Sequence, residues 1–368
     1  MSTGFFWDER CFWHGGGNYA FLAPVGGLVE PMPGGLPESP AAKRRLRSLI
    51  DVTGLAATLD MRGADPATWE DLARVHPEPF LEKFKMLSDD QGGELGLRTP
   101  FSKGGFEIAA LSAGLSVSAV SAVLSGEMRN AYALSRPPGH HCLPEWPNGF
   151  CLLANIAIAI EASLAKGLAR RIAVIDWDVH HGNGTEAIFY DRSDVLTISL
   201  HQERNYPLDT GDAEDRGRGA GEGFNCNIPL PPGTGEAGYL SAWDRIVVPQ
   251  VDAFAPDLII VACGFDASGV DPLGRMLLGA QSFAKLTARA SELADRHCGG
   301  RLVLVHEGGY SELHVPFCGH AAIATLAGSG IDAGDPLGPR IAGQQPGPEF
   351  DGFVEARIDA ITRTLGIG

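Results

Sequence analysis

Strand-like and helix-like segments alternate along this chain from about residue 105 onward. Apolar residues at helical spacing predict helices over residues 107–124, 155–166 and 281–297. Apolar runs of strand length alternate with them, at residues 131–135, 171–176, 195–201, 257–263 and 301–306. Such alternation is typical of a parallel sheet covered by helices. We therefore expect an α/β fold of three layers, α/β/α, with a central and mostly parallel sheet.

The N-terminal part of the chain is less regular. Residues 14–40 are rich in glycine and proline and predict a long loop. Ser39 and Pro40 resemble an N-cap and first-turn pair that opens a helix to residue 50. Further loops are expected at residues 209–223 and 328–347, before a final helix at 355–364. The sequence holds no internal repeat and no linker followed by a second periodic core, so we expect residues 1–368 to form one domain.

Composition narrows the class of protein. Hydrophobic residues make up 44% and charged residues 20% of the 368 positions, as in a globular protein with an ample core. A formal net charge of −16 argues against nonspecific binding to nucleic acid or anionic membranes. The seven cysteines form no Cys-x-x-Cys pair and are odd in number, which favours a reduced, cytoplasmic setting. Charged residues interrupt the N-terminus at Asp8, and the apolar stretch 150–160 is too short to span a bilayer, so neither a signal peptide nor a membrane span is expected.

Polar residues follow the ends of the predicted strands. They are His140 and His141, residues 176–181, His201, Asp266, and residues 307–310. In open α/β sheets the ligand crevice lies outside the carboxyl ends of the strands. The sequence therefore predicts that these polar groups gather at one edge of the sheet.

The segment from residue 176 to 184 reads Asp-Trp-Asp-Val-His-His-Gly-Asn-Gly. Asp176, Asp178 and His180 stand at alternate positions, so in an extended segment they share one face. Two carboxylates and an imidazole in that arrangement could hold a divalent transition metal. The alternative is a strand that ends in a polar turn with solvated acids, and a motif this short needs context to decide between the two.

The context is a set of motifs that resemble the zinc-dependent histone deacetylase family. They are Arg136-Pro137-Pro138-Gly139-His140-His141, Gly149-Phe150, residues 176–184, Ser199-Leu200-His201, Gly264-Phe265-Asp266-Ala267 and Glu307-Gly308-Gly309-Tyr310. They occur in the family's order and cover most of the chain between about residues 130 and 318. Through Asn183 and Asp271-Pro272-Leu273 the chain is most similar to the class II and bacterial amidohydrolase branch, which is related to acetylpolyamine amidohydrolases. The resemblance implies the arginase/deacetylase fold.

The resemblance also implies metal sites. It makes Asp178, His180 and Asp266 zinc ligands, and three such ligands leave positions open for water and a substrate carbonyl. Zinc lowers the pKa of bound water to about 7, which makes attack on an amide feasible at neutral pH. Two potassium sites are implied as well, built largely from backbone carbonyls. The inner one uses Asp176, Asp178, His180, Ser199 and Leu200, and the second uses Phe189, Arg192, Val195 and Phe224.

The family pattern gives the two adjacent histidines different roles. It pairs His140 with Asp176, and His141 with Asn183. His141 is then the general base for water and the later proton donor to the leaving amine. His140, held by a carboxylate, is expected to stay protonated. Where some relatives carry aspartate, Asn183 can orient His141 but cannot stabilise an imidazolium equally well, so we expect a neutral resting His141. His181 receives no catalytic role and is expected to be structural.

The remaining site residues would bind the substrate. Tyr310 can donate a hydrogen bond to the carbonyl oxygen as negative charge develops there. The carbonyl of Gly149 is expected to accept the substrate N–H, and Phe150 and Tyr206 to form the walls of a narrow tunnel for an alkyl chain. Aromatic side chains are also common in cores, an alternative that stays open for Tyr206 in particular. Leu273 stands where acetylpolyamine-selective relatives can carry an acidic residue, which argues against polyamine substrates.

We therefore expect a zinc-dependent amidohydrolase that removes an acetyl or other acyl group from an acylated amine such as Nε-acetyl-lysine. Related bacterial amidohydrolases form oligomers, which favours a homo-oligomer. Three alternatives are an acetylpolyamine deacetylase, an arginase-type binuclear manganese hydrolase, and a binding module that has lost turnover. The manganese site would require additional acidic ligands, and the complete set of catalytic groups argues against a binding module.

Overall fold

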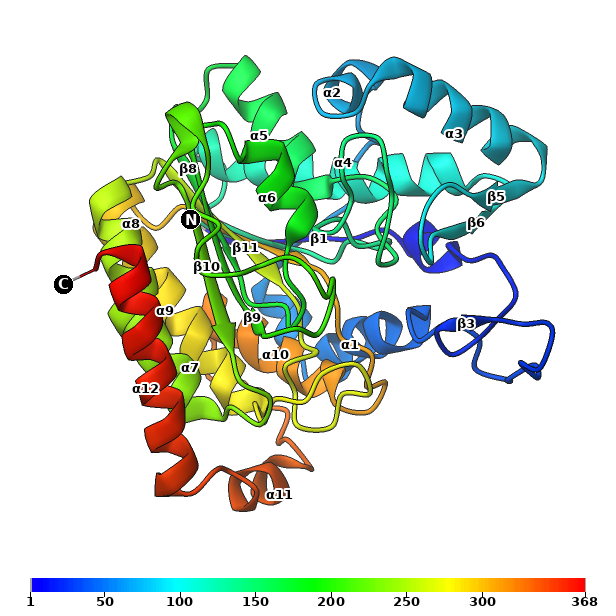
Figure 1. Cartoon of the computed structure of the whole chain (residues 1–368). Coiled ribbons are helices and arrows are strands. Elements are labelled where there is room, and N and C mark those ends of the chain that lie inside the picture. The colour runs from blue at the N-terminus through cyan, green and yellow to red at the C-terminus, as the bar shows by residue number, and fades with distance from the viewer. Residues whose placement is uncertain (1, 368) are drawn as a thin grey trace.

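The computed structural model describes residues 2–367 and confirms the three-layer α/β/α architecture (Figure 1). Its centre is an eight-stranded sheet in the order β10-β9-β8-β11-β12-β7-β1-β4, in which every neighbouring pair is parallel. The strands are β1 (Thr3–Phe6), β4 (Asp60–Arg62), β7 (Asn130–Ala133), β8 (Ile172–Asp176), β9 (Val195–Gln202), β10 (Asn225–Leu230), β11 (Leu258–Cys263) and β12 (Leu302–His306). Because all eight run the same way, their carboxyl ends share one edge of the sheet.

Successive residues of the central strands enter two different hydrophobic cores. Ile175 and Val261 belong to one cluster, whereas Val174 and Ile260 belong to the other. Both faces of the sheet are thus buried, which explains why these strands read as continuous apolar runs. The five strands expected from the sequence are present, with ends that differ by no more than two residues.

Helices cover both faces of the sheet (Figure 1). One face packs against α1, α7, α8, α9, α10 and α12, and the other against α4, α5 and α6, with α2 and α3 further out. The helices are α1 (Pro40–Val52), α2 (Trp69–Ala73), α3 (Glu78–Asp90), α4 (Gly105–Leu124), α5 (Asn155–Ala165), α6 (Asn183–Phe189), α7 (Glu236–Ala242), α8 (Val248–Phe254), α9 (Ala280–Cys298), α10 (Val315–Leu326), α11 (Gly338–Gly343) and α12 (Pro348–Leu365).

The start of α1 and the burial of α4 bear on two expectations from the sequence. Helix α1 begins as expected, because the Ser39 hydroxyl accepts a hydrogen bond from the backbone N–H of Ala41 and Pro40 occupies the first turn. Within residues 2–367, α4 is the single helix long and apolar enough to cross a membrane. However, 67% of its apolar window is buried inside the protein, where it packs beside α5.

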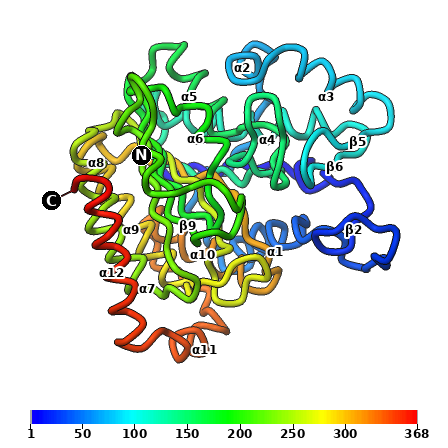
Figure 2. The backbone as a smooth tube through the Cα atoms, in the orientation of Figure 1, coloured from blue at the N-terminus to red at the C-terminus, as the bar shows by residue number. Residues whose placement is uncertain are grey.

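The loops expected from the sequence contain more regular structure than predicted. The expected loop at residues 14–40 contains a short hairpin, β2 (Tyr19–Ala20) and β3 (Ala23–Pro24), and α11 lies within the expected loop at 328–347. A second hairpin, β5 (Gly92–Glu94) and β6 (Pro100–Ser102), lies beside the 14–40 loop (Figure 2), and the backbone N–H of Ser102 donates to the carbonyl of Gly15.

Candidate metal centre and active site

The chain turns sharply where β8 ends, at Asp176. Its carboxylate accepts the backbone N–H of Asp178 at 3.0 Å, and the Asp178 carboxylate in turn accepts the N–H of His180 at 2.9 Å. These local bonds replace the strand ladder with turns. The expectation of one extended segment with three side chains on one face is therefore wrong: Asp178 and His180 meet Asp266, whereas Asp176 meets His140.

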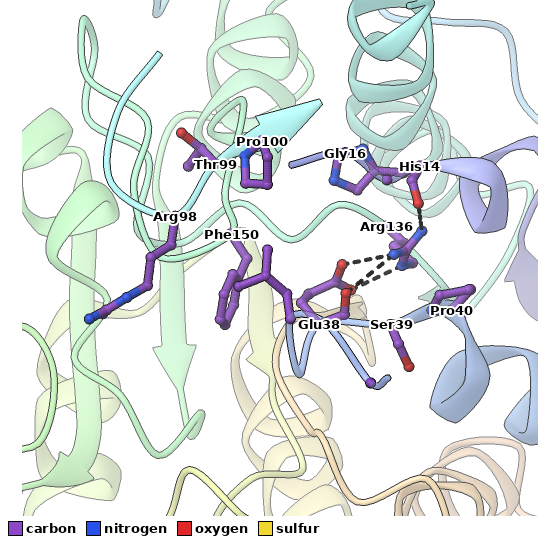
Figure 3. Close-up of a pocket in the computed structure, with 13 residues that line it drawn as sticks. His14, Gly16, Glu38, Ser39, Pro40, Arg98, Thr99, Pro100, Arg136 and Phe150 are labelled. Carbon is purple, nitrogen blue, oxygen red and sulfur yellow. Dashed lines mark hydrogen bonds and ion pairs between the residues drawn. The ribbon is translucent and has the colours of Figure 1, made fainter. Parts of the chain in front are cut away.

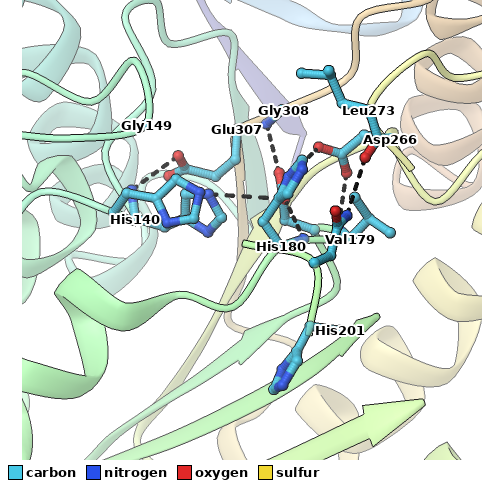
Figure 4. Close-up of polar contacts among 12 residues, drawn as sticks. His140, Gly149, Val179, His180, His201, Asp266, Leu273, Glu307 and Gly308 are labelled. Atoms are coloured by element: carbon cyan, nitrogen blue, oxygen red, sulfur yellow. Dashed lines mark hydrogen bonds and ion pairs between the residues drawn. The ribbon is translucent and has the colours of Figure 1, made fainter. Parts of the chain in front are cut away.

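Asp178, His180 and Asp266 converge to form a candidate metal centre (Figure 4). One ligand atom from each lies within 4.8 Å of the others, and all three residues are buried. Nδ1 of His180 is 3.0 Å from Oδ1 of Asp178 and 3.1 Å from Oδ2 of Asp266. Although Oδ2 of Asp266 lies close to that nitrogen, it accepts no well-directed hydrogen bond within the described residues. A buried carboxylate oxygen without a partner is costly, and two carboxylates with one imidazole suit zinc. The residues therefore fit the metal implied by the sequence.

Backbone groups orient both carboxylates. The N–H of Val179 donates to Oδ1 of Asp266 at 2.8 Å, and the N–H of Gly308 donates to Oδ2 of Asp178 at 2.8 Å. A Cβ atom at Gly308 would lie 2.2 Å from Oδ2 of Asp266 and 3.0 Å from the hydroxyl of Tyr310. Glycine is thus required there, and the Tyr310 hydroxyl lies close to the candidate metal ligands.

Both histidine pairings implied by the resemblance are present. Nδ1 of His140 is 2.9 Å from Oδ2 of Asp176, and Nδ1 of His141 is 2.8 Å from Oδ1 of Asn183. Burial disfavours the charged form of His140, but the carboxylates of Asp178 and Asp176 outweigh it and raise its pKa to about 10. Burial and the adjacent charge of His140 lower the pKa of His141 well below its usual value. A neutral His141 beside a protonated His140 is the arrangement expected from the sequence.

Two carboxylates hold the catalytic loops in place, and sequence reasoning gave neither of them a role. Oε2 of Glu307 accepts the backbone N–H groups of Gly139 and His140 at 2.7 and 3.1 Å. Oδ2 of Asp271 accepts the N–H of Tyr310 at 2.7 Å. Burial raises the pKa of each carboxyl to about 7. The available signal was weak, because Glu307 and Asp271 stand inside motifs but act on backbone groups that the sequence does not locate.

The aromatic residues border the same site. The ring of Phe150 lies 5.6 Å from that of Tyr310, and the ring of Tyr206 lies 4.9 Å from that of His141. The Tyr206 hydroxyl donates to the side-chain oxygen of Asn148 at 2.9 Å. Tyr206 is half-buried at the site and is not a member of the described hydrophobic clusters. A Cβ atom at residue 149 would lie 2.4 Å from the His141 ring, so Gly149 permits this close packing.

Two further histidines lie outside the candidate metal centre: His181 follows β8, and His201 lies in β9. Figure 4 shows His201 well away from His180. His201 lies inside β9, and its ring bonds Ser199 Oγ and the carbonyl of Gly211 at 2.9 and 3.0 Å. His181 contacts Thr210 at 2.8 Å and Glu186 at 3.1 Å. Through these contacts His181 holds the segment after β8 against Thr210 and Glu186, in keeping with the structural role expected for it.

The residues of the two expected potassium sites lie near β8, β9 and β10. Ser199 pairs with Asp176 across β8 and β9, and Leu200 is the next residue of β9. In the second set, the carbonyl of Phe189 accepts the N–H of Arg192 at 2.9 Å. Val195 begins β9, and Phe224 precedes β10. Cation binding at either place stays a prediction.

Comparison with solved structures defines the fold class. The chain superimposes on the HD domain of HDA15 with a TM-score of 0.84 and 29% sequence identity, covering 99% of this chain and 94% of that one. The sheet and its flanking helices thus form the arginase/deacetylase fold, in which polar groups from several strands meet at one edge.

Sequence comparisons define the family. A family model described as "Histone deacetylase domain" matches residues 36–326 of this chain. A histone deacetylase-like amidohydrolase of Pseudomonas aeruginosa is 54% identical over 366 residues, which cover 99% of this chain and 96% of the relative. A probable deacetylase of Archaeoglobus fulgidus is 44% identical over 268 residues, 73% of this chain and 74% of the relative. The chain belongs to the histone deacetylase family, as the motifs indicated.

Proposed function

We propose that the protein is a zinc-dependent deacetylase that hydrolyses the amide of an acylated amine, such as Nε-acetyl-lysine or a smaller acylamine. The observation that carries the proposal is the convergence of Asp178, His180 and Asp266 on one buried point, next to His141, whose pKa burial and the charge of His140 hold well below its usual value. Zinc held by these three residues would lower the pKa of a bound water and polarise the substrate carbonyl. Neighbouring side chains supply the proton transfers.

His141 is the general base and then the general acid. Because Oδ1 of Asn183 accepts a hydrogen bond from Nδ1, the hydrogen of the neutral ring is on Nδ1 and the lone pair is on Nε2. Nε2 takes the proton from the attacking water and later delivers it to the leaving amine nitrogen. His140 keeps its own proton because Asp176 and Asp178 stabilise the imidazolium, so its role is electrostatic.

Tyr310 stabilises the developing oxyanion. Burial raises the pKa of its phenol well above the usual value, so the hydroxyl stays protonated and donates throughout the neutral range. The alkyl chain of the substrate lies between Phe150 and Tyr206, and the Gly149 carbonyl accepts the amide N–H. Potassium at the two carbonyl-rich sets, a homo-oligomer and a cytoplasmic location all stay predictions.

Turnover of a fluorogenic acetyl-lysine peptide tests the proposal. Chelation is expected to abolish activity and added zinc to restore it, with about one tightly bound metal per chain. His141→Ala should lower kcat by roughly 10²–10⁴-fold because the proton transfers are lost. His297→Ala, in the last turn of α9, removes a histidine that pairs with Asp252 outside the site and serves as the control. Full activity of Asp178→Ala after chelation would contradict the proposal, and two metals per chain would favour the manganese hydrolase.

A further inference from the structure

Arg98 lies on the loop between β5 and β6, against the segment that carries Gly149 and Phe150. The carbonyl of Arg98 accepts the backbone N–H of Phe150 at 3.2 Å, and the carbonyl of Leu97 accepts that of Gly149 at 3.0 Å. The loop is therefore fixed to the backbone that would bind the substrate. Arg98 has a φ of 59°, a left-handed conformation uncommon for a residue with a side chain.

The guanidinium of Arg98 stacks on a wall of the candidate site. Its Cζ atom is 5.8 Å from the centroid of the Tyr206 ring, which is itself 4.9 Å from the His141 ring. Nε donates to the carbonyl of Leu22 at 3.2 Å, which fixes the direction of the side chain. The Tyr206 ring thus separates the positive charge of Arg98 from His141, the proposed general base. In Figure 3 the side chain points away from the Glu38–Arg136 pair, with Phe150 between them.

Within the part of the chain that the structure describes, Arg98 differs from the neighbouring Arg136 in having no counterion. Arg136 is buried and paired with Glu38 at 2.9 Å, whereas Arg98 is half-buried and forms no ion pair within residues 2–367. Within the same residues its side chain donates through Nε to Leu22, and its two terminal nitrogens donate no hydrogen bond. A guanidinium presents parallel donors that match a carboxylate, and stacking on an aromatic ring pre-organises it for that contact. In a chain with a net charge of −16, this is a localised positive charge beside the site.

We propose that Arg98 determines specificity by selecting acylated amines that carry a carboxylate at the entrance of the site, and by disfavouring cationic polyamines. This inference rests on the proposed deacetylase function. If Phe150 and Tyr206 enclose the alkyl chain of acetyl-lysine, the α-carbon and its substituents lie outside the aromatic pair, on the side of Arg98. Three kinds of substrate carry such a carboxylate: free acetyl-lysine, a peptide that ends in acetyl-lysine, and an acetylated ω-amino acid. The uncharged Leu273 offers no competing acidic group for a polyamine.

The experiment compares acetate release from matched substrates. Nα-benzoyl-Nε-acetyl-lysine with a free carboxylate is measured against its carboxamide, with N-acetylputrescine as the cationic substrate. The unmodified enzyme is expected to show a kcat/KM roughly tenfold higher for the carboxylate than for the carboxamide, because charge-assisted hydrogen bonds are stronger than neutral ones. Raising the ionic strength should shrink this ratio.

Two variants separate specificity from structural damage. Asparagine and aspartate tolerate the left-handed backbone, so Arg98→Asn should abolish the preference, with kcat/KM for the carboxylate falling to about that for the carboxamide. Arg98→Asp should invert the preference and raise turnover of N-acetylputrescine. Arg340→Asn on α11 removes an equal charge elsewhere and should keep the wild-type ratio.

A carboxylate-to-carboxamide ratio that is the same in wild type, Arg98→Asn and Arg98→Asp would overturn the role of Arg98. Equal losses on both substrates would show that the loop is merely structural and would overturn it also. Absence of turnover of all three substrates by the zinc-loaded wild type would instead refute the deacetylase proposal itself.

Discussion

At Gly308 the backbone passes directly against the carboxylates of Asp178 and Asp266, and its N–H holds one of them. The family resemblance implied both aspartates as zinc ligands, because each stands in a motif that follows an apolar strand. It did not predict the tasks of Glu307 and Asp271, which accept backbone N–H groups of loops distant in sequence. Such contacts depend on how close two loops come in space, and residue type and spacing do not record that distance.

Gly308→Ala is expected to impair metal binding without unfolding the chain. The added Cβ atom would meet Oδ2 of Asp266 at 2.2 Å, so the ligand carboxylates would have to move apart. We expect zinc affinity and kcat/KM to fall by roughly 10–100-fold, as for changes in the groups that orient metal ligands. Metal titration and turnover measure both effects. Gly330→Ala is the matched control, since no atom lies within 4 Å of a Cβ atom there; equal behaviour of the two variants would contradict the assigned geometry.

Asn183→Asp tests the pairing that orients His141. A carboxylate at this position would stabilise the imidazolium and raise the pKa of His141, which burial and His140 now hold low. The base must be unprotonated to act, so activity is lost below its pKa, and the acidic limb of the kcat/KM profile is expected to move to higher pH in the variant. The profile between about pH 5 and 9 provides the measurement. Coincident acidic limbs would refute the pairing.

At the scale of elements, patterns with long apolar runs were predictable and short or polar ones were not. The five expected strands, β7, β8, β9, β11 and β12, are rich in apolar residues and buried in the core, and the structure confirms them. β1 and β4 have only four and three residues, and β10 alternates asparagine with apolar residues, so none of them has a strand signal of its own. Tertiary pairing creates these strands: β1 completes hydrogen bonds with both β7 and β4.

A buried ion cluster links α1 to the segment that runs from Arg136 to His141, and Figure 3 shows its Glu38–Arg136 pair. Glu38, just before α1, is paired with Lys43 at 3.1 Å and with Arg136 at 2.9 Å, and all three side chains are buried. Glu38→Gln would leave two buried cations without a counterion. We expect the free energy of unfolding to fall by about 3–5 kcal/mol, measured by urea denaturation. Glu9→Gln, which breaks the exposed pair with Arg44, should cost about 0–1 kcal/mol.

The same cluster has a pH signature. Burial disfavours the charged carboxylate, but Arg136 and Lys43 outweigh it and lower the pKa of Glu38 to about 2. A folded pKa below the unfolded value of about 4.3 means that this stabilisation is complete above that pH and is lost as the pH falls towards 2. The difference in stability between wild type and Glu38→Gln should therefore shrink below about pH 4. A difference that stays constant down to pH 2 would show that Glu38 is not the titrating group.

At the scale of the whole molecule, the candidate metal centre draws its residues from separate parts of the sheet. Asp178 and His180 follow β8, Asp266 follows β11, and Gly308 beyond β12 holds the Asp178 carboxylate. Because β8, β11 and β12 are neighbours, the sheet brings two buried carboxylates together before any metal binds. Like charges that close repel each other, so the site stores an unfavourable interaction that a cation relieves. Stability and metal binding are therefore coupled.

Asp266→Asn should separate these two properties. In the metal-free protein it removes one of the two buried negative charges, so its melting temperature should equal or exceed that of the metal-free wild type. Zinc should raise the melting temperature of the wild type by several degrees, because a ligand bound to the folded state alone adds RT ln(1 + [L]/Kd) to its stability. Zinc should leave Asp266→Asn almost unchanged, because one of the three ligands is lost. Scanning calorimetry of both proteins, with chelator and with zinc, measures the four melting temperatures. If zinc stabilises Asp266→Asn as strongly as the wild type, the metal binds away from Asp266. If the metal-free variant melts well below the metal-free wild type, the Asp266 carboxylate supports the fold through contacts other than the metal.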